Sequence, residues 1–445
     1  MQVSKMDIRV QNLLEEIRSS YWFLPAVMTL SAIGLSVLTT IVDQQTQIPI
    51  TQNFGPVFGG GPEGARDLLT TVAGSMITVA GVTFSITIVA FSQASSQFGP
   101  RMLRNFMRDT GNQVVLGTFI ATYIYCLLIL RTVRVGTTQA FTPNVSVTVG
   151  LVLTLASLGV LIYFIHHTAL SMQAPIIISE LAGDLFSTID RLFPEHLGSG
   201  KQAREISAPP QPQGEPDCVT SKSEGYVLAL DTDSLMKIAT DNDLVFGVEF
   251  QPGRFLVQGA TIVRVWPSRR LNKRIAHMIR QTIVMGKRRT HTQDIEFAFE
   301  QLVEVAVRSL SPSINDPFTV ISCIDWLGAG LVRLVDREFP SGFRFDEAGD
   351  LRMILREPVS FDRLVEIAFN PIRRYAGESA GVRMRLLDVL YRTAQQTQKR
   401  QRLQALVNQA AIVKRSIYEE LSEVEDRRNV EARYQEIIKT AGIKL

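Results

Sequence analysis

The residues with the clearest capacity for chemistry lie on one helical stripe between Thr71 and Ser96. Read at the 3.6-residue period of a helix, small and hydroxyl-bearing side chains gather on one side of this segment, and large ones such as Phe84 and Phe91 lie elsewhere. The stripe consists of Thr71, Gly74, Ser75, Thr78, Gly81, Val82, Ser85, Ile88, Val89, Ser92, Ser95 and Ser96. Inside a membrane, such a face either packs closely against another helix or lines a wetted cavity.

A pore hypothesis gives each part of this stripe a role. Ile88 and Val89 interrupt the polar residues and would form an apolar gate that closes by dewetting. The hydroxyl-bearing positions would line the pore on both sides of the gate: Thr71, Ser75, Thr78, Ser85, Ser92 and Ser96.

Three arginines follow the stripe at spacings of three and four residues. Arg101, Arg104 and Arg108 would place positive charge at the inner mouth of a pore, which favours an anion or small polar solute there. Their simpler interpretation is the usual excess of basic residues in cytoplasmic loops.

The distribution of charged residues along the whole chain indicates that one part lies in a membrane and another in water. Sixteen charged residues lie between Met1 and Arg134, none lies between Arg134 and Glu180, and 73 lie from Glu180 onward. A membrane-spanning helix needs about 20 predominantly apolar residues. Four segments qualify as membrane spans: roughly Trp22–Val42, Leu68–Phe91, Val114–Leu130 and Val145–His166.

The basic residues also predict an orientation. Lys5, Arg9 and Arg18 precede the first span, and the second loop holds the three arginines named above, whereas the first loop has only Arg66. The positive-inside rule therefore places the N-terminus, the second loop and the C-terminal half in the cytoplasm. Arg131 and Arg134 in the third loop oppose this assignment slightly.

The fold class expected is a four-helix membrane protein with a cytoplasmic α+β part. Short strands separated by Pro-Gly and Gly turns predict a small β barrel or sandwich, and helical periodicity predicts the rest. The predicted parts are a cytoplasmic amphipathic lead-in 1–21, a transmembrane domain 22–167, an amphipathic helix 168–197 that continues the last span, a Pro-rich linker 198–223, a small β domain 224–267 and a helical domain 268–445.

The segment SPSINDP, from Ser311 to Pro317, joins two predicted helices. Asn315 or Asp316 can cap the second helix, and Pro317 suits its first position because proline has no amide to leave unpaired. Alternatively, the helix N-terminus with Ser311 and Ser313 could bind an anion, which the charge of Asp316 opposes.

We find no pattern typical of catalysis or metal binding. The sequence holds no GxSxG and no HExxH, its five histidines show no ligand spacing, and Cys126, Cys218 and Cys323 are far apart. We therefore expect a protein that is not an enzyme, with no cofactor, no metal site and no nucleic-acid partner.

The segments GYVLAL…GRFLVQGA and TQDIEFAFEQLVEVAVRSLSPSINDPFTVISCIDWLGA, together with four spans, resemble a bacterial family of predicted membrane proteins, domain of unknown function 2254. The resemblance covers nearly the whole chain, and SPSINDP is its most specific part. It implies a multi-pass protein of the bacterial inner membrane and supplies no substrate or catalytic residue.

The function that we expect from these observations is a homo-oligomeric channel or channel-like protein in the lipid bilayer. The second span would line its pore, and the cytoplasmic half would form a vestibule or regulatory body. The alternatives are a non-conducting membrane scaffold or sensor that binds a cytoplasmic partner and, third, a solute carrier.

Overall fold

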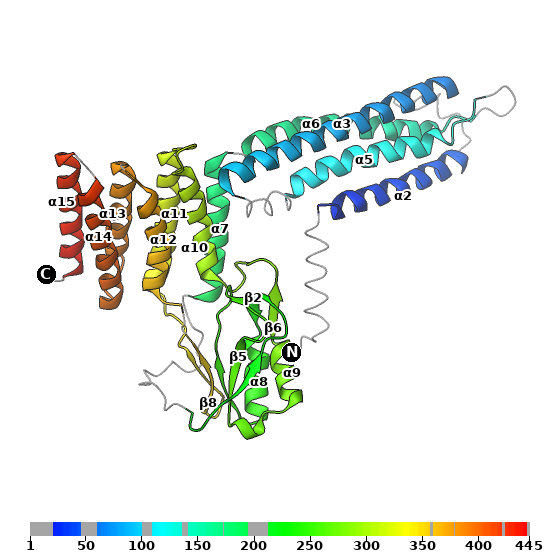
Figure 1. Ribbon diagram of the computed structural model, residues 1–445. Coiled ribbons are helices and arrows are strands. Elements are labelled where there is room, and N and C mark those ends of the chain that lie inside the picture. The colour runs from blue at the N-terminus through cyan, green and yellow to red at the C-terminus, as the bar shows by residue number, and fades with distance from the viewer. Residues whose placement is uncertain are drawn as a thin grey trace. The chain divides into compact units, whose positions relative to one another are not determined.

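The computed structural model divides the chain into two compact units, residues 1–176 and 177–445. It describes residues 21–45, 60–99, 109–135, 141–171, 173–194, 212–356, 359–377, 379–420 and 423–442. Figure 1 shows a bundle of long helices in the first unit and a mixed helical and β architecture in the second.

The first unit is a bundle of four long apolar helices. They are α2 (Phe23–Gln45), α3 (Gly61–Phe98), α5 (Thr110–Leu130) and α6 (Asn144–Ser171). α5 packs against the three others and is the most buried of the four, whereas α2 and α6 leave most of their apolar side chains exposed. Because no membrane surrounds these helices here, exposed leucines and isoleucines mark the surfaces that lipid covers.

Length distinguishes α3 from the other helices. Its 38 residues make a helix of about 57 Å, at 1.5 Å per residue. The hydrocarbon core of a bilayer is only about 30 Å thick. α3 therefore tilts strongly or extends beyond the hydrocarbon, and the polar sequence from Ser92 to Gln97 suits the second arrangement at its C-terminal end.

Five helices in the described residues are long and apolar enough to cross a membrane. Four are the helices of the first unit, and they coincide with the four predicted spans. The fifth is α11 (Pro317–Val335), which our count did not include. α11 packs against α10, α12 and α13 in the second unit, and more than half of it is buried there. The apolar residues of α11 therefore fit the core of the second unit as well as a membrane span.

The carboxylate of Asp43, near the end of α2, closes one end of the bundle. It accepts hydrogen bonds from the Val145 amide at 2.9 Å, the Ser146 amide at 2.9 Å and the Ser146 hydroxyl at 2.6 Å. These amides belong to the first turn of α6 and have no partner within that helix. Beside them, the Tyr125 hydroxyl donates to the Ser146 carbonyl at 3.0 Å and lies 3.0 Å from the Thr39 hydroxyl. One carboxylate thus joins α2 to α6.

α7 (Ala174–Leu192) is a separate helix, so the prediction that the last span continues through 168–197 is wrong. α6 ends at Ser171, and Pro175 is the second residue of α7. A proline ring at this position would clash with the carbonyl one turn earlier in a continuous helix, and proline has no amide to bond to it. The helix therefore breaks before Pro175 because of this clash and the missing hydrogen bond.

The second unit holds a row of helices beside a β module (Figure 1). The row comprises α7, α10 (Ile295–Ser309), α11, α12 (Phe361–Tyr375), α13 (Ala380–Ala394), α14 (Arg400–Glu420) and α15 (Val424–Ala441). The β module comprises β1 (Asp217–Thr220), β2 (Gly225–Leu230), α8 (Thr232–Asp241), β3 (Val245–Val248), β4 (Phe255–Leu256), β5 (Thr261–Trp266), η2 (Ser268–Arg270), α9 (Lys273–Gln281), β6 (Ile283–Gly286), β7 (Phe343–Phe345) and β8 (Leu351–Leu355).

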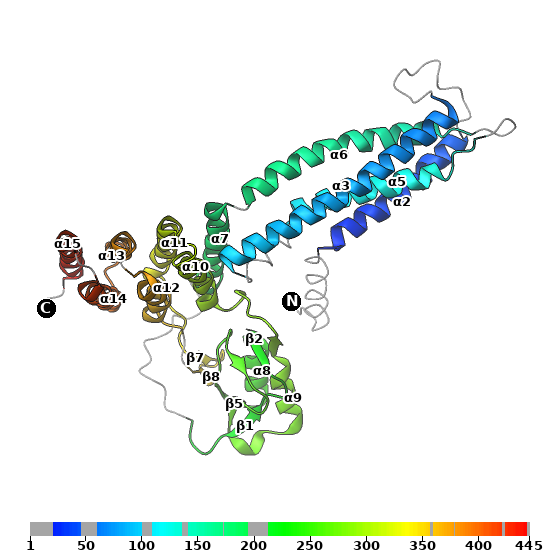
Figure 2. The same cartoon turned by 45° about the horizontal axis from the view of Figure 1, so that its top comes forward.

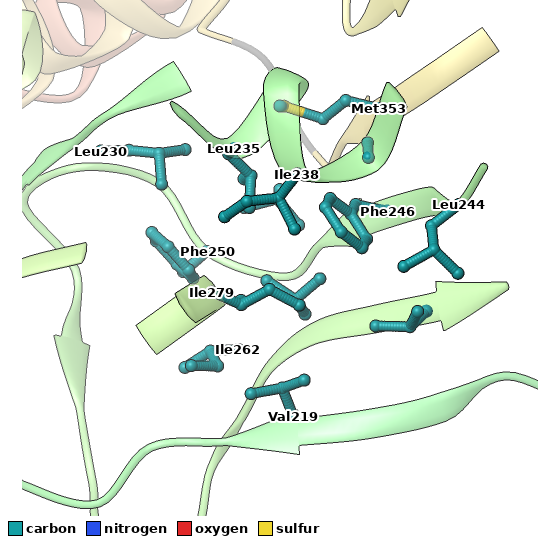
Figure 3. Close-up of a cluster of buried hydrophobic side chains, with 14 of the residues drawn as sticks. Val219, Leu230, Leu235, Ile238, Leu244, Phe246, Phe250, Ile262, Ile279 and Met353 are labelled. Carbon is teal, nitrogen blue, oxygen red and sulfur yellow. The ribbon is translucent and has the colours of Figure 1, made fainter. Parts of the chain in front are cut away.

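Two sheets build the β module. One has the order β1-β5-β3-β8-β7 and is antiparallel except for the parallel pair β3 and β8; the other has the order β4-β2-β6 and is antiparallel. Phe246 of β3 pairs with Val265 of β5 and with Met353 of β8. Figure 3 shows Phe246 and Met353 in a common core with Leu235 and Ile238 of α8.

The β module differs from the predicted small barrel or sandwich at 224–267. Within the described residues, the larger sheet ends at β1 and β7, so it is open. β1 lies in the predicted linker, of which residues 198–211 are outside the described residues, and β6, β7 and β8 lie in the predicted helical domain. β8 joins β3 from about a hundred residues away, and local patterns cannot specify such a pairing.

We predict that Asp43→Ala destabilises the bundle by roughly 1–3 kcal/mol, because two amides of α6 lose their acceptor. The measurement is thermal unfolding of the detergent-solubilised chain followed by circular dichroism. Asp67→Ala removes an exposed carboxylate from α3 and is the matched control. Equal unfolding midpoints for the two variants would show that the Asp43 clamp contributes nothing.

Candidate functional site

The candidate site is one face of α3. The opposite face of α3 packs against other helices of the bundle and leaves the candidate face exposed. The packed face carries small residues and phenylalanines. α3 packs against α5 and, to a lesser extent, α6, and Figure 2 shows α3 alongside α5. Its buried members are Ala65, Leu69, Ala73, Ala80, Thr83, Thr87, Ala90, Phe91, Ala94 and Phe98. Alanines and threonines let the helix backbones approach closely.

The predicted pore-lining residues share the opposite face of α3. All six are exposed: Thr71, Ser75, Thr78, Ser85, Ser92 and Ser96. Gly74 and Gly81 lie among them, and a Cβ atom added to either glycine would meet no atom of the described chain within 4 Å. Helix packing within the chain therefore does not account for this small, hydroxylated face.

The hydroxyl groups of this face have local partners. Ser75 donates to the carbonyl of Thr71 at 2.7 Å, and Thr78 donates to that of Gly74 at 2.8 Å. Ser85 does the same with Gly81 at 2.9 Å. Each oxygen keeps acceptor capacity after its proton is used. The face can thus rest in an apolar environment or accept hydrogen bonds from water.

The predicted gate residues lie on the same face. Ile88 is 48% exposed and Val89 is 69% exposed. They stand between the hydroxyls of Ser85 and Ser92, as the spacing predicted. Phe84, which we expected away from the stripe, is 39% exposed, so it is not buried on the packed face, where Thr83 and Thr87 lie.

The predicted inner-mouth arginines Arg101, Arg104 and Arg108 lie outside the described residues. α3 ends just before them, at Phe98. Gly99 follows with φ of 107°, a backbone conformation that side chains other than hydrogen rarely allow, and its amide donates to the Ser95 carbonyl at 3.1 Å.

A polar cluster that our sequence analysis did not identify lies at the end of the bundle opposite Asp43. Asp109 caps α5 by accepting from the Gly111 amide at 2.8 Å, and its carboxylate lies 2.7 Å from Nε2 of His167 at the end of α6. The Tyr163 ring stacks on His167 with centroids 5.2 Å apart. The capping preference of aspartate was the available signal. Its pairing with a residue 58 positions away carries no local signal.

SPSINDP forms a tight connection between α10 and α11. Asp316 is the N-cap of α11: its carboxylate accepts from the Phe318 and Thr319 amides, both at 3.1 Å, and from the Thr319 hydroxyl at 2.6 Å. Pro317 is the first residue of the helix, and Asn315 adopts a left-handed conformation with φ of 46°. The Ser311 and Ser313 hydroxyls lie 3.3 Å apart.

The environment of Asp316 favours its charged form. Partial burial alone would raise its pKa, but the hydrogen bonds from the Thr319 hydroxyl and from the two amides outweigh it and lower the pKa of Asp316. Stability from this cap is therefore complete above the ordinary aspartate pKa of about 3.9 and is lost as the pH falls through the lower folded-state value.

In the second unit, a groove of about 560 Å³ lies between α11 and α13. Its floor is small and apolar, with Gly328 directly against Val389. Arginines line the groove, and Arg385 makes two hydrogen bonds of 2.5 and 2.6 Å to Asp325. Among the described residues, no group of three or more His, Cys, Asp and Glu side chains could hold a metal ion.

Comparison with known proteins places these features in a family. The family described as "Predicted membrane protein (DUF2254)" matches residues 18–392. An uncharacterized protein of Mycobacterium tuberculosis, Rv1290c, is 31% identical over 448 residues, which cover 98% of this chain and 84% of the relative. An uncharacterized protein of Mycobacterium bovis, Mb1321c, is similar to the same extent. No solved structure matches the chain.

For SPSINDP we predict two separable effects on stability. Asp316→Ala should lower the free energy of unfolding by roughly 0.5–2 kcal/mol through the lost cap. Asn315→Ala should cost about 1 kcal/mol, whereas Asn315→Gly should cost nothing, because only glycine adopts the left-handed conformation without strain. Denaturant unfolding of the full chain in detergent, followed by circular dichroism, measures both. Equal effects of Ala and Gly at position 315 would contradict the backbone argument.

Proposed function

The chain belongs to the DUF2254 family of predicted membrane proteins, and we propose that it assembles as a homo-oligomeric channel whose pore is lined by α3. The observation that carries this proposal is the exposed, small and hydroxylated face of α3, which no helix of the described chain covers. The exposed faces of α2 and α6 present mainly leucine, isoleucine and valine, with a few small residues such as Ser31, Gly34 and Gly159, whereas α3 gathers its exposed hydroxyls and glycines on one stripe.

The spacing along this face supports assembly with further copies. Its residues form three rows at intervals of seven: one from Thr71 through Thr78 and Ser85 to Ser92, one with Gly74 and Gly81, and one with Ser75, Val82, Val89 and Ser96. A seven-residue period keeps one seam facing a neighbour when helices cross with a left-handed twist. In a closed ring, each helix meets its two neighbours through different rows.

In such a ring the rows have distinct tasks. The glycine row allows close approach of one neighbouring helix, and the two hydroxyl-bearing rows face the axis. Val89 lies in one of these two rows, and Ile88 continues the glycine row beside it, so together they form the narrow apolar section. Water leaves a narrow apolar ring because it cannot recover its hydrogen bonds there, and an ion faces a desolvation penalty on crossing.

The remaining parts of the proposal come from the charge pattern. The excess of basic residues before the first span and in the second loop over the first loop supports a bacterial inner-membrane protein with four spans and with both termini in the cytoplasm. Arg101, Arg104 and Arg108 would then stand at the inner mouth and favour an anion or small polar solute. In this proposal the protein is not an enzyme and needs no cofactor, and the second unit serves as a vestibule or regulatory body.

Oxidative cross-linking tests the assembly through α3. Cys126 and Cys323 are buried and Cys218 is exposed, so a Cys218→Ser parent offers no accessible thiol. Thr78→Cys in this parent should form disulfide-linked dimers in membranes, because rows that face a common axis bring the same residue of neighbouring copies close together. Thr83→Cys, on the packed face, is the matched control and should stay monomeric on gels. Absence of dimers from Thr78→Cys and from Ser85→Cys would contradict assembly through this face.

The gate is tested by conductance. Val89→Ser should wet the apolar section and raise the conductance of the purified protein in planar bilayers, because the new hydroxyl supplies hydrogen bonds to water. Ile162→Ser places the same hydroxyl on an exposed site of α6 and is the matched control for adding a polar group at the lipid surface. Intact oligomers of Val89→Ser that pass no more current than the parent, at any voltage or tension, would remove α3 from the pore.

One observation favours the alternative of a membrane scaffold or sensor. The groove between α11 and α13 combines an apolar floor with Arg333, Arg385 and Arg392, which suits a helix or peptide that carries carboxylates. Cross-linking through α3 without conductance would favour this alternative over a channel. A solute carrier is the third candidate.

A further inference from the structure

The helical row of the second unit has exposed apolar side chains at one of its ends. Phe318, the second residue of α11, is 81% exposed, the highest value among the large apolar side chains that the structure describes. Ile314, in the connection before it, is 40% exposed, and Tyr375, the last residue of α12, is 62% exposed. We call Ile314, Phe318 and Tyr375 the apolar rim.

Helix register places these three residues at one level. α11 and α13 run parallel, because Asp325 in the middle of α11 pairs with Arg385 in the first half of α13, and Asp336 at the end of α11 bonds to Thr397 just after α13. α12 connects to the start of α13 by the short segment 376–379, so its last residue, Tyr375, lies level with the start of α11.

The start of α7 lies at the same level. α7 and α11 run parallel, because Phe186 contacts Trp326 with ring centroids 5.8 Å apart, and Asp190, one turn later, pairs with Arg337 at 2.7 Å. Counting back from these contacts at 1.5 Å per residue brings Ala174 and Phe318 level to within about one helical turn.

Only a short connection separates the start of α7 from the last membrane-spanning helix. Ala174 follows Ser171, the last residue of the long apolar helix α6, by three residues. Three residues span at most about 10 Å, and packed helices lie about 8–10 Å apart. The start of α7 therefore lies close to the end of α6 along the chain.

We propose that the apolar rim inserts into the headgroup boundary of the lipid bilayer and anchors the second unit to the membrane surface. Phenylalanine, tyrosine and isoleucine bury their apolar parts at this depth, and tyrosine keeps its hydroxyl in the polar layer. Arg374, exposed beside Tyr375, adds attraction to anionic headgroups.

A lipid surface fits the rim better than a second copy of the chain. A stable protein interface buries about 800 Å² per partner, whereas two aromatic side chains and one isoleucine supply only a few hundred. A bilayer needs no matching shape, and the tether to α6 keeps it at high effective concentration. Val424 is exposed in the far helix of the row, but Glu423, Glu425 and Asp426 flank it, so we exclude it from the rim.

The test uses the full chain in vesicles of phosphatidylethanolamine and phosphatidylglycerol. A single bimane fluorophore is attached to Phe318→Cys, or to Ile314→Cys as a second site, in the Cys218→Ser parent. Phe255→Cys is the matched control: it is 53% exposed, and it lies two residues from Gly253, which contacts Asp294 at the opposite end of α10.

Doxyl-labelled lipid should quench the fluorophore at positions 318 and 314, with a blue-shifted emission, and iodide should not. At position 255 iodide should quench and doxyl lipid should not. Iodide quenching at 318 and 314 as strong as at 255 would place the rim in water and overturn the proposal. Protection of both positions from both quenchers would also overturn it, in favour of a second copy or another part of this chain as the cover.

Discussion

The packing of α3 on α5 is the contact on which the interpretation of this protein depends. α5 lies against all three other helices of the first unit, and α3 meets it through alanines, threonines and two phenylalanines. α2 approaches α5 just as closely: a Cβ atom added to Gly117 would lie 3.2 Å from the Cα of Pro25. With these surfaces used, the hydroxyl and glycine face of α3 has no partner left within the described bundle. One side of α3 therefore packs closely against α5, and the other side presents the exposed polar face.

The polar contacts of the first unit hold this bundle together. The carboxylates of Asp43 and Asp109 act at opposite ends, where each caps one helix and joins it to another. Between them, hydroxyls of the exposed face donate to carbonyls of their own helix. Such a face tolerates apolar surroundings and also accepts hydrogen bonds from water.

Local patterns in the sequence identified the four apolar helices, the two-faced character of α3 and the turn chemistry of SPSINDP, because each depends on residues within a few helical turns. The signal of Pro175 was present and would have separated α6 from α7. By contrast, β8 pairs with β3 across about a hundred residues, and the side of Phe84 depends on where α5 lies. The contact of Asp109 with His167 is equally non-local. Long-range packing determines these features, and no local period encodes them.

The geometry of SPSINDP unites a structural and a surface role. The left-handed backbone at Asn315, the cap by Asp316 and the fixed φ of Pro317 together determine the path of the chain into α11. That path leaves Phe318 pointing away from the core, although burying a phenylalanine stabilises a fold by about 1.5–3 kcal/mol. Two neighbours in the same helix, Thr319 and Val320, are buried, so the core was within reach. A rigid turn that holds a large apolar side chain outward gives the second unit an apolar surface outside its core.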